Sequence, residues 1–139
     1  MAKTLPMNAL GISSAPGRAE GAHTALKARQ AAAAVAWART RLGLSLAEVA
    51  TAVGASARTV ARWAEGAVAP SPAHRRRLEE LGESRHLLET VFPDWTAALE
   101  WAHTSSAALR GRTPVGEITR GHIAAVIEVL AALESGAYT

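Results

Sequence analysis

Two arginines of the 139-residue sequence, Arg58 and Arg62, carry its clearest chemical signal, because they stand four residues apart. Side chains at that spacing lie on the same face of a helix. Arginine pairs well with guanine edges and with phosphate groups. Ser56 could offer its hydroxyl or a helix-terminal N–H to a phosphate, and Thr59 lies alongside. We therefore predict that Ser56, Arg58, Thr59 and Arg62 contact DNA.

The surrounding segment Leu46–Trp63 has the residues needed to position such a helix. Ala50 falls where two helices would cross, and its small side chain lets their backbones approach. Gly54 falls at the turn between them, where glycine tolerates a positive φ. The pattern resembles the helix-turn-helix of phage-repressor-like, Xre-type proteins, whose second helix enters the major groove by its N-terminal part. The same residues also fit a three-helix packing module whose arginines are solvated.

Three further arginines, Arg75, Arg76 and Arg77, stand near the start of a later predicted helix. Cations at that end oppose the helix dipole, so another interaction, such as one with phosphate, should favour them. We therefore add Arg75 and Arg76 to the predicted DNA contacts. The alternative is neutralisation within the chain, because Glu79 and Glu80 follow Arg75 and Arg76 by four residues.

Charge is unevenly distributed along the chain. Residues 1–86 contain 12 Lys and Arg against 6 Asp and Glu, whereas residues 87–139 contain 3 against 6. A basic first half suits an anionic polymer, and the opposite balance of the second half suggests a second surface with another partner.

Several classes of protein are disfavoured. The chain has no cysteine, and its five histidines lack metal-ligand spacing. No run of about 18 apolar residues could span a membrane, and we expect a cytoplasmic protein without a membrane partner. The carboxylates of the second half show no paired catalytic pattern, so we expect nearly all of them to be solvated. We expect no catalytic residue, metal, cofactor or enzyme activity. These carboxylates are Glu89, Asp94, Glu100, Glu117, Glu128 and Glu134.

The 33 alanines of the sequence favour an all-α fold, because alanine is the best helix former. We predict a flexible tail over residues 1–23, where glycine and proline interrupt any helix, and a first helix capped by Thr24. A helix-turn-helix domain over 24–84 and a small helical domain over 85–139 follow. The predicted helices after Thr24 cover about 25–41, 46–53, 57–64, 72–92, 95–103, 114–120 and 122–134, with Gly82 as a possible break.

The second half carries a longer motif. Its order and spacing resemble the toxin-binding domain of the Xre/MbcA/ParS antitoxin family. Together with Ala61–Gly66 upstream, the resemblance to an MbcA-type antitoxin extends over residues 34–139. The residues that carry it are Trp101, Ala108–Pro114, Gly121, Val126, Leu130 and Gly136–Tyr138.

The resemblance implies a partner toxin with a RES domain that degrades NAD+, whose active-site entrance the antitoxin's C-terminal segment closes. By residue, Gly136, Ala137, Tyr138 and Thr139 would form the plug, with Arg112 and the polar face of the last helix nearby. Gly136 also fits an ordinary helix C-cap, and the Tyr138 ring could fold back on that helix.

The resemblance also implies that the helix-turn-helix binds promoter DNA and represses the antitoxin's own operon. It would do so as a homodimer or in a larger toxin–antitoxin hetero-oligomer. The alternative is a stand-alone Xre-type DNA-binding transcriptional regulator, whose second half only dimerises.

Overall fold

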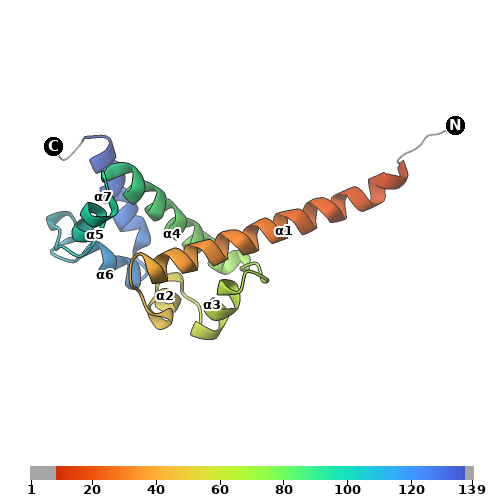
Figure 1. Ribbon diagram of the computed structural model, residues 1–139, viewed down its shortest axis with the longest axis horizontal. Coiled ribbons are helices and arrows are strands. Elements are labelled where there is room, and N and C mark those ends of the chain that lie inside the picture. Colours follow the sequence, from red (N-terminus) through yellow and green to blue (C-terminus); the bar gives the residue numbers. More distant parts are fainter. Residues whose placement is uncertain (1–8, 137–139) are drawn as a thin grey trace.

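The computed structural model describes the backbone of residues 9–136 and the side chains of residues 20–136. That part of the chain is helical without a β-strand, so the predicted all-α fold class is confirmed (Figure 1). The helices are α1 (Ala9–Thr40), α2 (Leu46–Val53), α3 (Ala57–Ala64), α4 (Pro72–Val91), α5 (Trp95–Ala102), α6 (Pro114–Thr119) and α7 (Ile123–Glu134), with the 3-10 turn η2 (Ala107–Leu109) before α6.

The first helix differs most from its prediction. It begins at Ala9, so Thr24 lies inside the helix and the predicted cap is wrong. The predicted interruption by glycine and proline is also wrong for residues 9–23, while residues 1–8 lie outside the described part. Each glycine costs a helix interior only about 1 kcal/mol, whereas Pro16 costs about 3 kcal/mol. Adding turns to an existing helix is far easier than nucleating one, which favours continuation of α1 beyond these residues.

Only the C-terminal part of α1 packs on the protein. Residues 20–26 are exposed, and the first buried side chain among those described is Ala28. From there α1 contacts α2, α3 and α4, and its N-terminal part projects away from the other helices (Figure 1). The buried face consists largely of alanines and ends at Ala38. Next to Ala38, the ring of Trp37 makes an edge contact with Trp95 at 6.1 Å between centroids.

The short helices α2 and α3 form the helix-turn-helix. Ser45 caps α2: its Oγ accepts the Glu48 N–H at 3.0 Å, and Glu48 Oε1 accepts the Ser45 N–H at 2.8 Å. Gly54 ends the helix with a φ of 73°. Val60 and Trp63 are buried, as the spacing predicts, so the opposite face of α3 is directed outward.

The long helix α4 joins the two halves of the chain. It contacts α1 and α2 on one side and α5 and α7 on another. Leu81 and Leu88 are 1% exposed, and the helix continues through Gly82 without the break that the sequence suggested. The predicted domain boundary between residues 84 and 85 lies inside this helix.

The last helices follow the predicted pattern closely. Asp94 caps α5, and Thr113 caps α6 ahead of Pro114. The apolar face of α7 packs against α4 and α6, and its residues Val126 and Leu130 are fully buried. Within residues 9–136, no helix has both the length and the apolar character that a membrane span requires.

One arginine connects these helices to the helix-turn-helix. Arg77 Nη1 of α4 donates a hydrogen bond to the carbonyl oxygen of Ala52, near the end of α2, at 3.0 Å. A Cβ atom at Gly121, in the turn between α6 and α7, would lie only 2.6 Å from the same nitrogen. Three segments distant in sequence therefore meet at this guanidinium group.

Replacing Gly121 with alanine is expected to lower the free energy of unfolding more than replacing Gly43 with alanine. The φ angles are 87° and 75°, and a positive φ costs alanine about 1 kcal/mol. A Cβ at Gly43 meets nothing within 4 Å. A Cβ at Gly121 displaces the Arg77 guanidinium from the Ala52 carbonyl, which should lower the free energy of unfolding by about 1 kcal/mol more. Urea unfolding measures both losses.

The same measurement in an Arg77→Ala background tests the cause. There the additional cost of Gly121→Ala should disappear, because the hydrogen bond to Ala52 is already lost. If Gly121→Ala still lowers the free energy of unfolding more than Gly43→Ala in that background, displacement of Arg77 is not the cause of the additional loss.

Candidate functional site

The outward face of α3 carries the predicted DNA contacts. Arg58 and Arg62 are exposed and one helical turn apart. Within the described residues, neither lies within ion-pair distance of a carboxylate. Both guanidinium groups are therefore available to an external anion.

The predicted hydroxyl contacts are already engaged with one another. Ser56 Oγ accepts the Thr59 N–H at 3.1 Å and donates to Thr59 Oγ1 at 2.9 Å. Ser56 thus caps α3 and fixes the start of the helix that carries the two arginines. Any phosphate contact from these residues adds to this capping role.

The three arginines at the start of α4 have three different environments. Arg76 is paired with Glu80 at 3.7 Å, so neutralisation within the chain is confirmed for that residue. It is not found for Arg75, because Glu79 pairs with Lys27 of α1 at 3.5 Å. Arg77 binds the carbonyl of α2 described above. Arg75 lines a groove between α1 and α4 and is not part of the outward face of α3.

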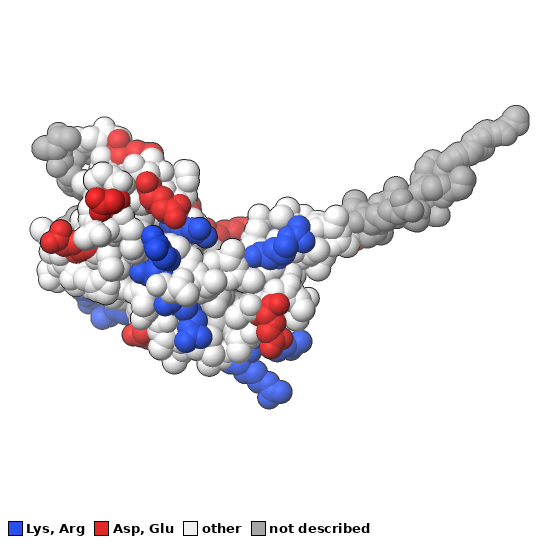
Figure 2. Space-filling model, viewed as in Figure 1, with Lys and Arg blue, Asp and Glu red and all other residues white. Residues whose placement is uncertain are grey.

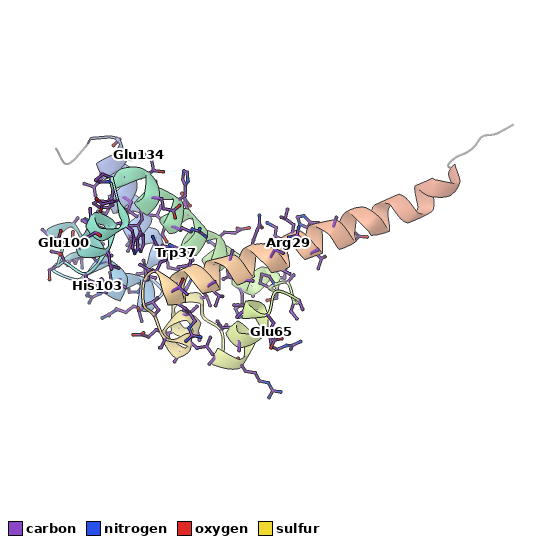
Figure 3. The ribbon with its side chains drawn as sticks, in the orientation of Figure 1. Arg29, Trp37, Glu65, Glu100, His103 and Glu134 are labelled. Atoms are coloured by element: carbon purple, nitrogen blue, oxygen red, sulfur yellow. The ribbon has the colours of Figure 1, made fainter. Side chains whose placement is uncertain are left out.

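The charges of the folded chain are separated in space. On the face shown in Figure 2, acidic side chains gather over the end formed by α5 and α7, whereas lysines and arginines dominate the centre and the side of α3. Figure 3 places Glu100 and Glu134 at that acidic end and Glu65 beside α3. On this face, the uneven charge of the sequence therefore becomes an acidic end over α5 and α7 and a largely basic centre.

A charged cluster surrounds Glu117 of α6, which the sequence prediction treated as solvated. That prediction is wrong: the side chain is only 8% exposed. Its Oε1 lies 3.4 Å from Arg112 Nη1 and 3.8 Å from Arg120 Nε, and its Oε2 lies 3.3 Å from His122 Nδ1. A buried carboxylate needs such partners. The surplus of basic residues in 110–122 was the signal that could have identified it.

The predicted toxin-binding residues fall at opposite ends of α7. Arg112 is half-exposed and pairs with Glu117, next to the start of α7, whereas Gly136 follows the end of that helix. The structure therefore does not bring these two residues together, because the 12 residues of α7 extend over about 18 Å.

The C-terminal glycine has the geometry of a helix end. Gly136 has a φ of 82°, and its N–H donates to the Leu133 carbonyl at 3.1 Å. This is the conformation in which glycine commonly terminates a helix. The other predicted plug residues, Ala137, Tyr138 and Thr139, lie outside the described residues.

Comparison with known proteins identifies the family. No family model matches the chain. The mycobacterial cidal antitoxin MbcA of Mycobacterium tuberculosis is 34% identical over 107 residues, which cover 77% of this chain and 94% of the relative. MbcA of Mycobacterium bovis matches equally well. The chain belongs to the MbcA antitoxin family.

A solved structure supports this relationship. The crystal structure of the M. tuberculosis MbcT–MbcA toxin–antitoxin complex matches with a TM-score of 0.55 and 33% sequence identity. The match covers 78% of this MbcA-family chain and 96% of the other. The family resemblance in the sequence is therefore confirmed, and the fold agrees with that of an MbcA antitoxin.

Replacing Glu117 with glutamine is expected to lower the free energy of unfolding by about 2 kcal/mol. The buried carboxylate loses its charge, and the two arginines lose their partner, although their half-exposed side chains remain hydrated. Urea unfolding measures the loss. The matched control is Glu89→Gln, which removes an exposed pair with Arg85 and should cost less than about 0.5 kcal/mol. Equal losses would contradict a special role for Glu117.

Proposed function

We propose that this chain is a non-enzymatic antitoxin that binds and neutralises a cognate toxin. The observation that carries the proposal is its 34% identity to MbcA over 94% of that antitoxin's length. A match over 107 residues is longer than either half of the chain, so it cannot be confined to the helix-turn-helix. The relative's complex with MbcT supports a protein toxin as the partner. The motifs of the second half favour a toxin of the RES class, which degrades NAD+.

The toxin-binding surface in this proposal includes α7 and the segment that follows it. The inner face of α7 is buried, while Glu128 and Glu134 are exposed on its outer side. Gly136 allows the chain to leave the helix axis after Ser135. Gly136–Thr139 would close the toxin's active-site entrance, and the exposed acidic side of α7 would face the basic surroundings expected of a nucleotide-binding site.

Deleting Gly136–Thr139 is expected to abolish neutralisation without changing the helical content. Cells that express the toxin with the truncated antitoxin should lose NAD+ and stop growing, whereas cells with the full chain should grow. Circular dichroism checks the fold. The matched control removes four residues, Ala2–Leu5, from the other end. Normal growth of toxin-expressing cells with the C-terminally truncated antitoxin would contradict the proposal that Gly136–Thr139 closes the active-site entrance of the toxin.

The second part of the proposal is repression of the antitoxin's own operon through α3. Exposed arginines on the outward face of a capped helix suit the major groove. Two half-sites would be contacted by a homodimer or by a larger assembly with the toxin.

Replacing Arg58 and Arg62 with alanine is expected to weaken promoter binding by about 1–3 kcal/mol for each residue that contacts a base. A gel-shift titration at fixed salt measures the loss. The control is Arg110→Ala, because this exposed arginine follows η2 in the other half of the protein. Unchanged promoter affinity in the α3 variants would show that Arg58 and Arg62 do not contact DNA in the major groove. Promoter binding without any toxin neutralisation would instead favour the stand-alone regulator.

A further inference from the structure

A groove between α1 and α4 lies outside the surfaces discussed above. It encloses about 400 Å³. Its floor consists of small and apolar side chains, with Ala31, Ala34 and Leu78 all buried. This volume and lining are typical of sites for small organic ligands.

The rim of the groove carries four charged groups, of which three are paired. Lys27 and Glu79 form an ion pair across the groove at 3.5 Å. Arg85 is paired with Glu89 of the same helix at 3.3 Å. Among residues 20–136, no carboxylate lies within ion-pair distance of the fourth group, Arg75. The groove therefore holds one unmatched positive charge.

One nitrogen atom of Arg75 has no hydrogen-bond partner in the described part of the fold. Its Nε atom is buried, and none of the described residues offers it a hydrogen-bond acceptor. A buried donor without an acceptor destabilises a fold, so such an atom calls for a functional explanation. Arg75 as a whole is only partly buried and lines the groove, so a ligand there would bind the edge of its guanidinium group that lies away from the shielded Nε.

We propose that the groove binds a small organic carboxylate, with its carboxylate on Arg75 and its apolar body on the alanine and leucine floor. The planar guanidinium group matches a carboxylate through two parallel hydrogen bonds. One unmatched cation matches a single negative charge better than the double charge of a phosphate ester. The apolar floor favours a hydrocarbon body over a fully polar anion. This site is independent of the proposed antitoxin function.

Gly82 keeps the groove open. It lies inside α4, and a Cβ atom there would meet no atom within 4 Å. A larger residue would raise the helix propensity and extend into this space, since Gly82 lines the groove. Gly82→Leu therefore fills the groove while leaving every charge in place.

To test the proposal, the protein is titrated with hexanoate, and the affinity is measured by isothermal titration calorimetry and by NMR. We expect saturable 1:1 binding that weakens about tenfold or more in Arg75→Gln and in Gly82→Leu. The matched control is Arg76→Ala, which removes the neighbouring charge from a side chain that is 87% exposed. Its affinity should stay within about twofold of the original. Hexanol lacks the charge and inorganic phosphate lacks the apolar body, so both should bind far more weakly.

Three outcomes would overturn the proposal. The first is the absence of saturable hexanoate binding at concentrations up to about 10 mM. The second is an equal loss in Arg76→Ala, which would indicate diffuse charge attraction. The third is unchanged binding in Gly82→Leu, which would place the ligand elsewhere. Thermal unfolding shows whether each variant is folded. If Arg75→Gln does not fold, the loss of hexanoate binding in Gly82→Leu is the test of the proposal.

Discussion

The buried leucines of α4 hold the two halves of this chain in one core. Helices α1 and α2 pack on one side of α4, and α5 and α7 pack on another. Leu81 and Leu88 are almost completely buried between them. Removing this helix would leave the apolar faces of both groups in water, at a cost of about 25 cal/mol for each Å² exposed. The outward face of α3 and the end of α7 consequently have a fixed geometric relationship.

That arrangement would give the two proposed partners, toxin and DNA, separate access to the protein. The exposed arginines of α3 and the acidic outer side of α7 lie on different parts of the molecule, with α4 between them (Figures 1 and 3). An antitoxin that binds both a toxin and DNA needs such a separation, because each partner would otherwise exclude the other. Arg77 adds a direct polar link between the two parts, through Ala52 on one side and the turn at Gly121 on the other.

The features that sequence predicted well are those with local signals. The predicted helix starts at residues 46, 57 and 95 agree with α2, α3 and α5, because Ser45, Ser56 and Asp94 cap these helices through side-chain hydrogen bonds within four residues of sequence. The start of α1 was missed because glycine and proline between residues 9 and 23 were expected to interrupt any helix. The burial of Glu117 was missed because it depends on Arg112, Arg120 and His122, which surround it only in the folded chain. From the sequence alone, a charged residue is expected to be solvated.

The groove was beyond sequence reasoning for a related physical reason. Glu79 follows Arg75 by four residues, which favours a pair along one helix face. The fold instead brings Lys27 to Glu79 from another helix, and Arg75 is left without that partner. Long-range competition for one carboxylate therefore decided which arginine stays unmatched. A single sequence contains no measure of that competition.

The projecting part of α1 has a consequence for how the protein moves through solution. From Ala9 to the first packed turn near Ala28 the helix extends about 28 Å beyond the remaining helices. A rod of that length attached to a small body raises hydrodynamic drag far more than it raises mass. A single copy of the chain would therefore elute early in size-exclusion chromatography, where it resembles a heavier particle. Its oligomeric state is better determined by light scattering or sedimentation equilibrium, which respond to mass and not to shape.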